Sequence, residues 1–191
     1  MRGRFQYWFY WACLAEAGLV GVAWPLGRWL DVDWRQALQW KREAAVGGVL
    51  TSLPLLGLFW LTLHARSRLL VAVRTVLEKR LRPVVESASI PQLAIISVLA
   101  GIGEEALFRG ALQGGLDIHW GLGPALVVAS LAFGAAHAVS ISYSVVATAI
   151  GALLGIEYVV TGTLWTPIIT HAAYDFLALV YWLRVYPVPA R

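Results

Sequence analysis

The sequence predicts an all-α fold, a polytopic transmembrane helical bundle of about six spans plus a basic interfacial helix. Hydrophobic residues make up 59% of the 191-residue chain and charged residues only 14%, whereas globular proteins carry about 25% charged residues. Mean hydropathy is +0.69. The apolar residues gather into six runs near the roughly 20 residues that cross a bilayer, namely 5–26, 45–64, 91–113, 123–140, 143–161 and 164–186. We expect one integral-membrane domain over residues 1–191.

The first run has the outline of a secretory signal, with Arg2 and Arg4 before an apolar stretch. However, Glu16 interrupts the stretch, which then continues to Trp24 and is followed by five more runs. We therefore interpret it as a retained first span. Cys13 is the one cysteine, so an internal disulfide and a cysteine-based metal site are both excluded.

A basic segment separates the second and third runs. Apolar residues such as Leu69 and Val73 alternate there with six cations, Arg66, Arg68, Arg74, Lys79, Arg80 and Arg82. This pattern is typical of an amphipathic helix that lies on anionic lipid headgroups. Such a helix accounts for the charge without a nucleic-acid partner, so we expect the bilayer as partner and no nucleic acid. The positive-inside rule places the segment in the cytoplasm, and six spans would bring both termini to the same side.

Three later runs carry ionisable clusters that a bilayer normally tolerates only at functional sites. The third contains Glu104, Glu105 and Arg109, the fourth has His137 four residues after Phe133, and the sixth has Asp175 four residues after His171. Residues four apart share one helix face, so each helix can direct its pair toward a common centre. We expect an intramembrane hydrolytic site there. The fifth run instead carries Gly151 and Gly155, a spacing that favours close helix packing.

Within the first cluster the two glutamates have different surroundings. Adjacent residues point about 100° apart around a helix. Arg109 is placed to pair with Glu105, which leaves Glu104 as the freer carboxylate. A buried ion pair that only fixes packing is the alternative interpretation. A lone membrane histidine such as His137 can also serve as an interhelical hydrogen-bond donor, whereas Asp175 can orient the imidazole of His171 or join it on a metal.

Other ionisable residues were not assigned to this site. His64 ends the second run, and His119 lies in a short loop. Glu16 and Glu157 have no evident partner in the sequence. With the amino terminus inside, Glu104 would lie about 20 Å along the third run at 1.5 Å per residue, nearer the outer face.

The three clusters form a recognisable ordered set. Residues 104–110, Glu-Glu-Ala-Leu-Phe-Arg-Gly, resemble the E-E-x-x-x-R motif of the CAAX prenyl protease and bacteriocin-processing (CPBP, Abi) family of intramembrane proteases. Residues 133–137, Phe-Gly-Ala-Ala-His, are similar to its F-x-x-x-H motif, and residues 171–175, His-Ala-Ala-Tyr-Asp, to its H-x-x-x-N/D motif. The resemblance covers about residues 91–180, which we regard as the family-like catalytic core.

The resemblance implies a bundle with a hydrophilic cavity that hydrolyses peptide bonds of membrane-associated or prenylated, CAAX-type substrates. Glu104 would activate the water and His137 would help to hold it. His171 and the residue at position 175 would polarise the scissile carbonyl, and Glu105 would support them. Arg109 and Phe133 are supporting residues. These roles suit amide hydrolysis, which needs a base to deprotonate the attacking water and hydrogen-bond donors to stabilise the developing oxyanion.

Asp175 departs from the asparagine that is commoner at this position of the family. An ionised carboxylate repels an oxyanion, so Asp175 would orient His171 or bind a cation. Three acids against Arg109 leave excess negative charge in a low-dielectric site. A divalent metal, most plausibly zinc, held by Glu104, His137, His171 and Asp175 would balance this charge. The alternative is a metal-free, glutamate-type site with one acid protonated and a histidine charged.

Two other function classes remain open from the sequence. The first is a non-proteolytic immunity or scaffold protein of the same family, and the second is an ion- or proton-coupled carrier. The intact set of two acids and two histidines favours the protease, and no repeat of discontinuous helices supports a carrier. Composition and the lack of an organellar targeting signal predict a bacterial plasma membrane.

Overall fold

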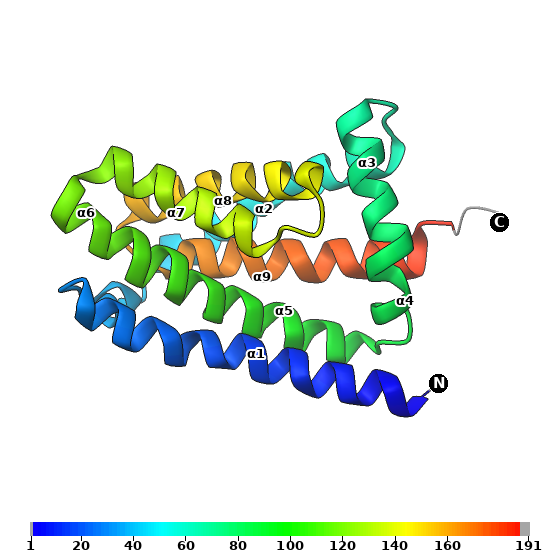
Figure 1. The fold of residues 1–191 in the computed structure, drawn as a ribbon, viewed down its shortest axis with the longest axis horizontal. Helices are drawn as coiled ribbons and strands as arrows, with labels where there is room; N and C mark the ends of the chain where they lie inside the picture. Colours follow the sequence, from blue (N-terminus) through cyan, green and yellow to red (C-terminus); the bar gives the residue numbers. More distant parts are fainter. Residues whose placement is uncertain (1, 188–191) are drawn as a thin grey trace.

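The computed structural model describes residues 2–187, which fold into helices joined by short connections, with no strand among them (Figure 1). Four short 3₁₀ or π segments link or extend the helices: η1 (Trp34–Leu38), η2 (Leu77–Leu81), η3 (Ala106–Gln113) and η4 (Tyr181–Val185). The α-helices are α1 (Arg2–Trp29), α2 (Arg42–His64), α3 (Arg68–Val76), α4 (Arg82–Val85), α5 (Ile90–Glu105), α6 (Gly114–Trp120), α7 (Leu122–Ala136), α8 (Ile141–Thr161) and α9 (Trp165–Val180). The predicted all-α class is confirmed.

Several helical stretches of the described chain are long and apolar enough to cross a membrane. There are five: Tyr7–Trp29, Arg42–His64, Ile90–Trp120, Ile141–Thr161 and Trp165–Val185. Large apolar side chains such as Trp11, Leu50 and Val127 are more than half exposed on the outside of the bundle, where a bilayer would cover them. The protein is an integral membrane protein.

The fourth predicted run, 123–140, forms a shorter helix than we expected. Helix α7 has 15 residues, or about 22 Å at 1.5 Å per residue, against a hydrocarbon core of about 30 Å. It ends at Ala136 because His137 adopts turn dihedrals, φ −97° and ψ 23°. Ser140 then caps α8 by accepting a hydrogen bond from the Tyr143 amide. His137 therefore stands at a break inside the bundle and not within a helix.

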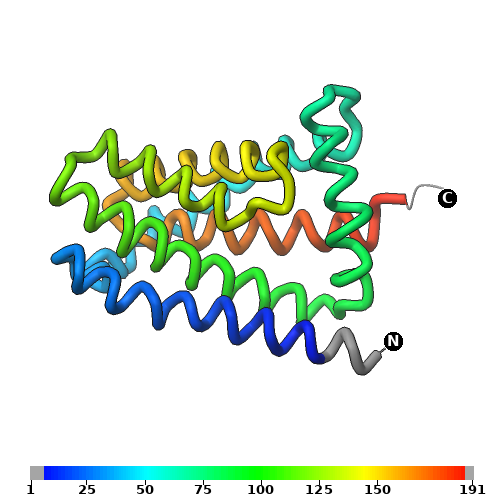
Figure 2. Tube along the Cα trace, viewed as in Figure 1, coloured from blue at the N-terminus to red at the C-terminus, as the bar shows by residue number. Residues whose placement is uncertain are grey.

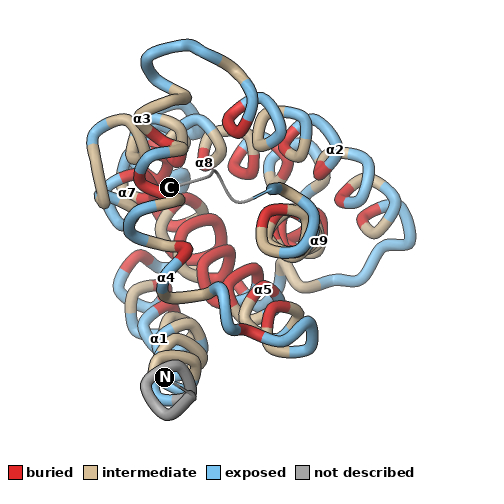
Figure 3. Tube along the Cα trace, turned by 90° about the vertical axis from the view of Figure 1, so that its right-hand side faces the viewer, coloured by how far each residue is buried: buried red, intermediate tan, exposed pale blue. Residues whose placement is uncertain are grey.

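Helix α5 lies at the centre, packed against α1 on one side and α9 on the other, while α2 packs on α9 and α7 on α8. Figure 3 shows that the buried residues of α5 and α9 face the middle of the bundle. Glycines permit this packing. A Cβ at Gly103 would collide with the Glu16 carbonyl of α1, and a Cβ at Gly101 would lie 2.9 Å from the Ile168 carbonyl of α9.

The basic segment forms an arm, α3–η2–α4, across the end of the bundle where both termini lie (Figures 1 and 2). Its α3 is the expected amphipathic helix, but its apolar side is covered by protein. Val73 and Leu77 are buried with Leu63 and Trp182. The predicted headgroup contacts are thus left to the exposed cations of the arm, such as Arg66 and Arg68.

Several cations of the arm bind the bundle. The Arg74 guanidinium donates to the Leu63 carbonyl (2.7 Å), and Arg82 donates to the Trp182 carbonyl (3.0 Å). Arg82 also pairs with Glu78 at 2.7 Å. The first two bonds tie the arm to the end of α2 and to η4, which follows α9, whereas the Arg82–Glu78 pair lies within the arm.

Candidate active site

The π-helical segment η3 carries the supporting arginine. It continues α5 without a break into α6, so residues 90–120 form one long helix. π-Helical turns within α-helices frequently mark functional sites. Arg109 and Gln113 leave η3 toward α8 and donate to the carbonyls of Gly151 (2.9 Å) and Gly155 (3.1 Å). The two glycines, expected to serve packing, therefore also present their carbonyls to η3.

Glu105 stands at the centre of a buried network. It is fully buried, and its Oε1 accepts from Arg109 Nη1 at 3.1 Å and from His171 Nδ1 at 2.8 Å. Arg109 is 1% exposed. The ion pair expected between Glu105 and Arg109 is present, and it orients an imidazole as well.

His171 is bracketed by carboxylates. Its Nδ1 donates to Glu105, and its Nε2 lies 3.5 Å from Asp175 Oδ2. Both ring nitrogens therefore face acceptors. Asp175 lines the cavity beside the ring, and its expected role, to orient His171 or to bind a cation, stays a prediction.

The Phe133 ring ties the helices of the site together. It stacks on His137 with ring centroids 4.5 Å apart and meets His171 edge-on at 6.0 Å. The Arg109 guanidinium lies 4.4 Å from its centroid, a cation–π distance. Phe133 thus sets the positions of both histidines and the arginine.

His137 is fixed in one tautomer by the end of α7. Its Nδ1 lies 2.8 Å from the Phe133 carbonyl oxygen. Because a carbonyl can only accept, Nδ1 must carry the hydrogen, and in the neutral ring Nε2 has the lone pair. That Nε2 lies 3.7 Å from Glu104 Oε2, too far for a direct hydrogen bond but short enough for one water to bridge.

Among the described residues, Glu104 pairs with no arginine or lysine, and the basic group that faces it is His137. It is 8% exposed, and its buried Oε2 has no hydrogen-bond partner. It lines a cavity of about 230 Å³ together with His137, His171 and Asp175. The rest of this first cavity is mostly apolar, with Phe59, Ile150 and Leu179 among its lining residues, and it reaches Leu77 and Val85 of the arm.

The expected depth of Glu104, nearer the outer face, took the third run to end at residue 113. The third span extends to Trp120 and has 31 residues, so Glu104 lies about halfway along it. The apolar run of the sequence ends sooner because Gln113 and Asp117 interrupt it, although the helix continues. The cavity extends from Glu104 to the arm, at the basic end of the molecule.

Part of the chain that carries this site is similar to a known protein family. Residues 86–177 match a family model described as type II CAAX prenyl endopeptidase Rce1-like. We refer to this matching stretch as the Rce1-like domain. An uncharacterized protein of Bacillus subtilis, YpbD, is 39% identical over 90 residues, which are 46% of this chain and 43% of that protein. The chain thus spans less than half the length of that relative. No solved structure matches.

The Rce1-like domain begins near the end of α4 and contains Glu104, Glu105, His137, His171 and Asp175 as well as both supporting residues. The resemblance to the CAAX prenyl protease and bacteriocin-processing family is confirmed over this part of the chain. Helices α1 to α3 lie outside it. His64 and His119 are exposed at opposite ends of the molecule, and neither lines the cavity.

Two acids that sequence analysis left out lie close to the site. Glu157 of α8 accepts a hydrogen bond from Thr170 Oγ1 (3.0 Å), just before His171. Glu16 of α1 interacts electrostatically with His171, Asp175 and Glu104. The partner of Glu157 is 13 residues away in sequence, and the groups near Glu16 are about 90 to 160 residues away. The spacing of residues within one helix therefore could not have predicted either contact.

The expected zinc site needs several donors that converge on one point. Among residues 2–187, no group of three or more His, Cys, Asp or Glu side chains is arranged to hold a metal ion. Both nitrogens of His171 already face carboxylates. The residues of the Rce1-like domain therefore do not form the proposed ligand set, and the zinc hypothesis stays a prediction to be tested.

Proposed function

We propose that this protein is an intramembrane endopeptidase in which Glu104 activates a water to hydrolyse a peptide bond of a membrane-associated, CAAX-type substrate. The observation that carries the proposal is the unpartnered Glu104 oxygen facing His137 across 3.7 Å inside a cavity. The Rce1-like family match supports the reaction class.

Glu104 and His137 are suited to hold the attacking water. Oε2 of Glu104 and Nε2 of His137 are both acceptors, so a water between them donates one hydrogen to each and keeps a lone pair for the substrate carbonyl. Glu104 takes the proton as the water oxygen bonds to the carbonyl carbon. It then passes this proton to the amide nitrogen as the C–N bond breaks, which leaves a carboxylic acid and an amine. The acid then gives its proton to the amine, so the products are a carboxylate and an ammonium group.

His171 is suited to stabilise the oxyanion of the tetrahedral intermediate. Glu105 holds Nδ1 of the ring, which leaves an Nε2–H to donate toward the cavity, where Asp175 is 3.5 Å away. Asp175 acts as a positioning residue, because its carboxylate holds the ring in place and an oxyanion donor must be protonated. Arg109 neutralises Glu105 behind the ring.

The first cavity supports an apolar substrate. Its lining from α2, α8 and the arm is largely aliphatic and aromatic, which suits a lipid chain or apolar side chains attached to the peptide. The cavity reaches the basic end of the protein, where the positive-inside rule places the cytoplasm.

Reconstituted protein and a quenched fluorescent peptide with a lipid anchor test this function. Wild type should cleave the peptide, and Glu104→Gln should lose at least about 1,000-fold in turnover while the helical circular dichroism spectrum is unchanged. His64→Gln is the matched control and should retain wild-type turnover. Equal turnover by Glu104→Gln and wild type would rule out this assignment. Absence of turnover with retained peptide binding would favour the scaffold function.

A further inference from the structure

A second cavity lies on the other side of the Glu104–Asp175 pair. It has a volume of about 160 Å³ and lies between α1, the start of α5 and α9. It shares Glu104 and Asp175 with the first cavity and adds Glu16 of α1. No lysine, arginine or histidine lines it within the described part of the chain. Both cavities are lined mostly by apolar residues, but the first also holds His137 and His171, whereas the second holds three carboxyl groups and no basic side chain.

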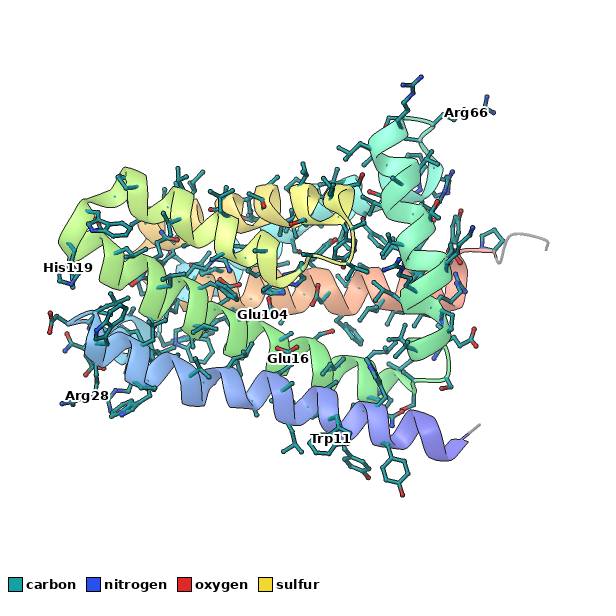
Figure 4. The ribbon with its side chains drawn as sticks, viewed as in Figure 1. Trp11, Glu16, Arg28, Arg66, Glu104 and His119 are labelled. Carbon is teal, nitrogen blue, oxygen red and sulfur yellow. The ribbon has the colours of Figure 1, made fainter. Side chains whose placement is uncertain are left out.

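The position of Glu16 is set by backbone packing. Helix α1 approaches α5 most closely at Gly103, where a Cβ would collide with the Glu16 carbonyl and lie 3.4 Å from Leu19 Cβ. Figure 4 labels Glu16 and Glu104 near each other, in the middle of the bundle. The residue before Glu104 therefore fixes the register of α1, so the two carboxyl groups are held on facing helices.

Two of the three acids of this cavity, Glu16 and Glu104, each have a buried oxygen without a hydrogen-bond partner. Glu16 Oε2 and Glu104 Oε2 are both buried without a hydrogen bond, and Glu104 is more than nine-tenths buried. A buried polar atom without a partner costs about 1–3 kcal/mol, and ionisable residues at membrane depth are functional-site candidates. The missing partner of Glu16 can be supplied by a bound molecule.

The carboxyl groups of the cavity indicate that the bound molecule carries a positive charge. The nearby guanidinium of Arg109 is already bound to Glu105 and the Gly151 carbonyl. Asp175 lies 3.5 Å from His171 Nε2, so Glu16 is the carboxyl group of this cavity that has no salt bridge to a basic residue of the described chain. A basic side chain would supply both a hydrogen bond and a charge to it.

We propose that the second cavity is a substrate subsite for a lysine or arginine side chain close to the scissile bond, with Glu16 as its recognition carboxylate. This inference rests on the proposed hydrolytic function. The apolar part of the substrate occupies the first cavity, the basic side chain enters the second, and the peptide bond between them passes Glu104. Specificity would then depend on α1, which lies outside the Rce1-like domain.

Lipid-anchored peptides that differ at a single residue test the subsite. Each residue flanking the cleaved bond is replaced in turn by lysine, by norleucine, which has similar length and no charge, or by glutamate. Equilibrium binding and kcat/KM are measured for each peptide. Wild type should prefer lysine to norleucine by about tenfold or more at one position, with glutamate the weakest. Glu16→Gln should shrink this ratio to below about threefold, and Glu16→Lys should reverse the order of lysine and glutamate.

Glu43→Gln, at the exposed start of α2, is the matched control and should keep the wild-type ratio. The proposal is contradicted if the wild type binds lysine and norleucine peptides equally at every position. It is also contradicted if Glu16→Gln keeps the wild-type ratio of lysine to norleucine binding. Binding does not depend on cleavage, so these outcomes are separate from the Glu104→Gln result, which tests hydrolysis. If Glu16→Gln fails to fold, the wild-type preference and the Glu16→Lys variant still decide the question.

Discussion

At the scale of single residues, the site is a chain of bonds in which each group fixes the next. Arg109 binds Glu105, Glu105 binds His171, and Phe133 contacts Arg109 and both histidines. Glu104 alone keeps a buried oxygen that faces a histidine across a gap. Glu105 Oε2 has no hydrogen-bond partner either, but of these two carboxyl groups only Glu104 lines the cavity.

We predict that Glu104, His137 and His171 act as one unit. Glu104→Gln, His137→Ala and His171→Ala should each abolish peptide turnover while the protein still inserts and folds. The double variant Glu104→Gln/His137→Ala should be little worse than either single one, because groups that act on the same water give non-additive losses. Single-turnover kinetics with circular dichroism as a folding check measures this. Losses that multiply would show that the residues act independently.

Arg109→Leu should destabilise the protein by about 3–5 kcal/mol, because it leaves the buried Glu105 carboxylate without its cation. The double change Glu105→Leu/Arg109→Leu should recover part of this stability, although activity stays lost. Thermal unfolding in detergent compares the three forms. An unchanged melting temperature in Arg109→Leu would contradict the buried pair.

Metal dependence is tested by elemental analysis of the purified protein and by activity before and after a strong chelator. We expect unchanged turnover in a preparation without bound zinc, cobalt or manganese, because His171 is held between two carboxylates and the described residues offer no group of three or more donors for a metal. Loss of activity on chelation and its return with zinc would restore the zinc hypothesis. The control is the same chelation in the presence of excess calcium.

At the scale of elements, helix breaks and glycines place the site residues. The π segment η3 turns Arg109 and Gln113 toward α8, and α7 stops at Ala136 so that the His137 ring reaches Glu104. Gly155 lets Leu126 of α7 and Gln113 of η3 approach α8 closely. The helices meet at the site because particular residues leave room for them.

Gly155→Ala should cost about 1–3 kcal/mol of stability, the usual effect of overpacking. The added Cβ would lie 2.5 Å from Leu126 Cδ1 and 2.6 Å from Gln113 Oε1. Turnover should fall too, because displacing Gln113 shifts η3 and Arg109. Gly57→Ala in α2 is the control, since its Cβ would meet nothing within 4 Å. Thermal unfolding and turnover are measured for both, and a stable, active Gly155→Ala would argue against close packing there.

At the scale of the whole molecule, the basic residues of the arm lie at the same end of the bundle as the part of the first cavity farthest from Glu104. The basic arm and both termini lie at the end toward which the first cavity extends, while Arg28 and His119 mark the opposite end (Figure 4). Because lysine and arginine accumulate on the cytoplasmic side, the site should open to the cytoplasm.

Single cysteines on a Cys13→Ala background test this orientation. A membrane-impermeant maleimide should label His119→Cys in intact cells, whereas Arg66→Cys should react only after the membrane is opened. Both positions are exposed on the protein surface. A cysteine that does not react in intact cells is therefore shielded by the membrane and not by burial within the protein. The reverse labelling pattern would place the cavity mouth outside.

By itself the sequence determined the membrane class, the basic segment and the residues of the Rce1-like motifs, because apolar length and i, i+4 spacing are local properties of a helix. It also predicted the Glu105–Arg109 pair, which lies within one helix. The tertiary structure decided the rest. The approach of Glu16 to Glu104, and the bonds from Arg109 and Gln113 to α8, depend on contacts between helices far apart in the chain. No spacing within one run encodes those contacts, since they follow from how glycines and carbonyls of one helix meet the next.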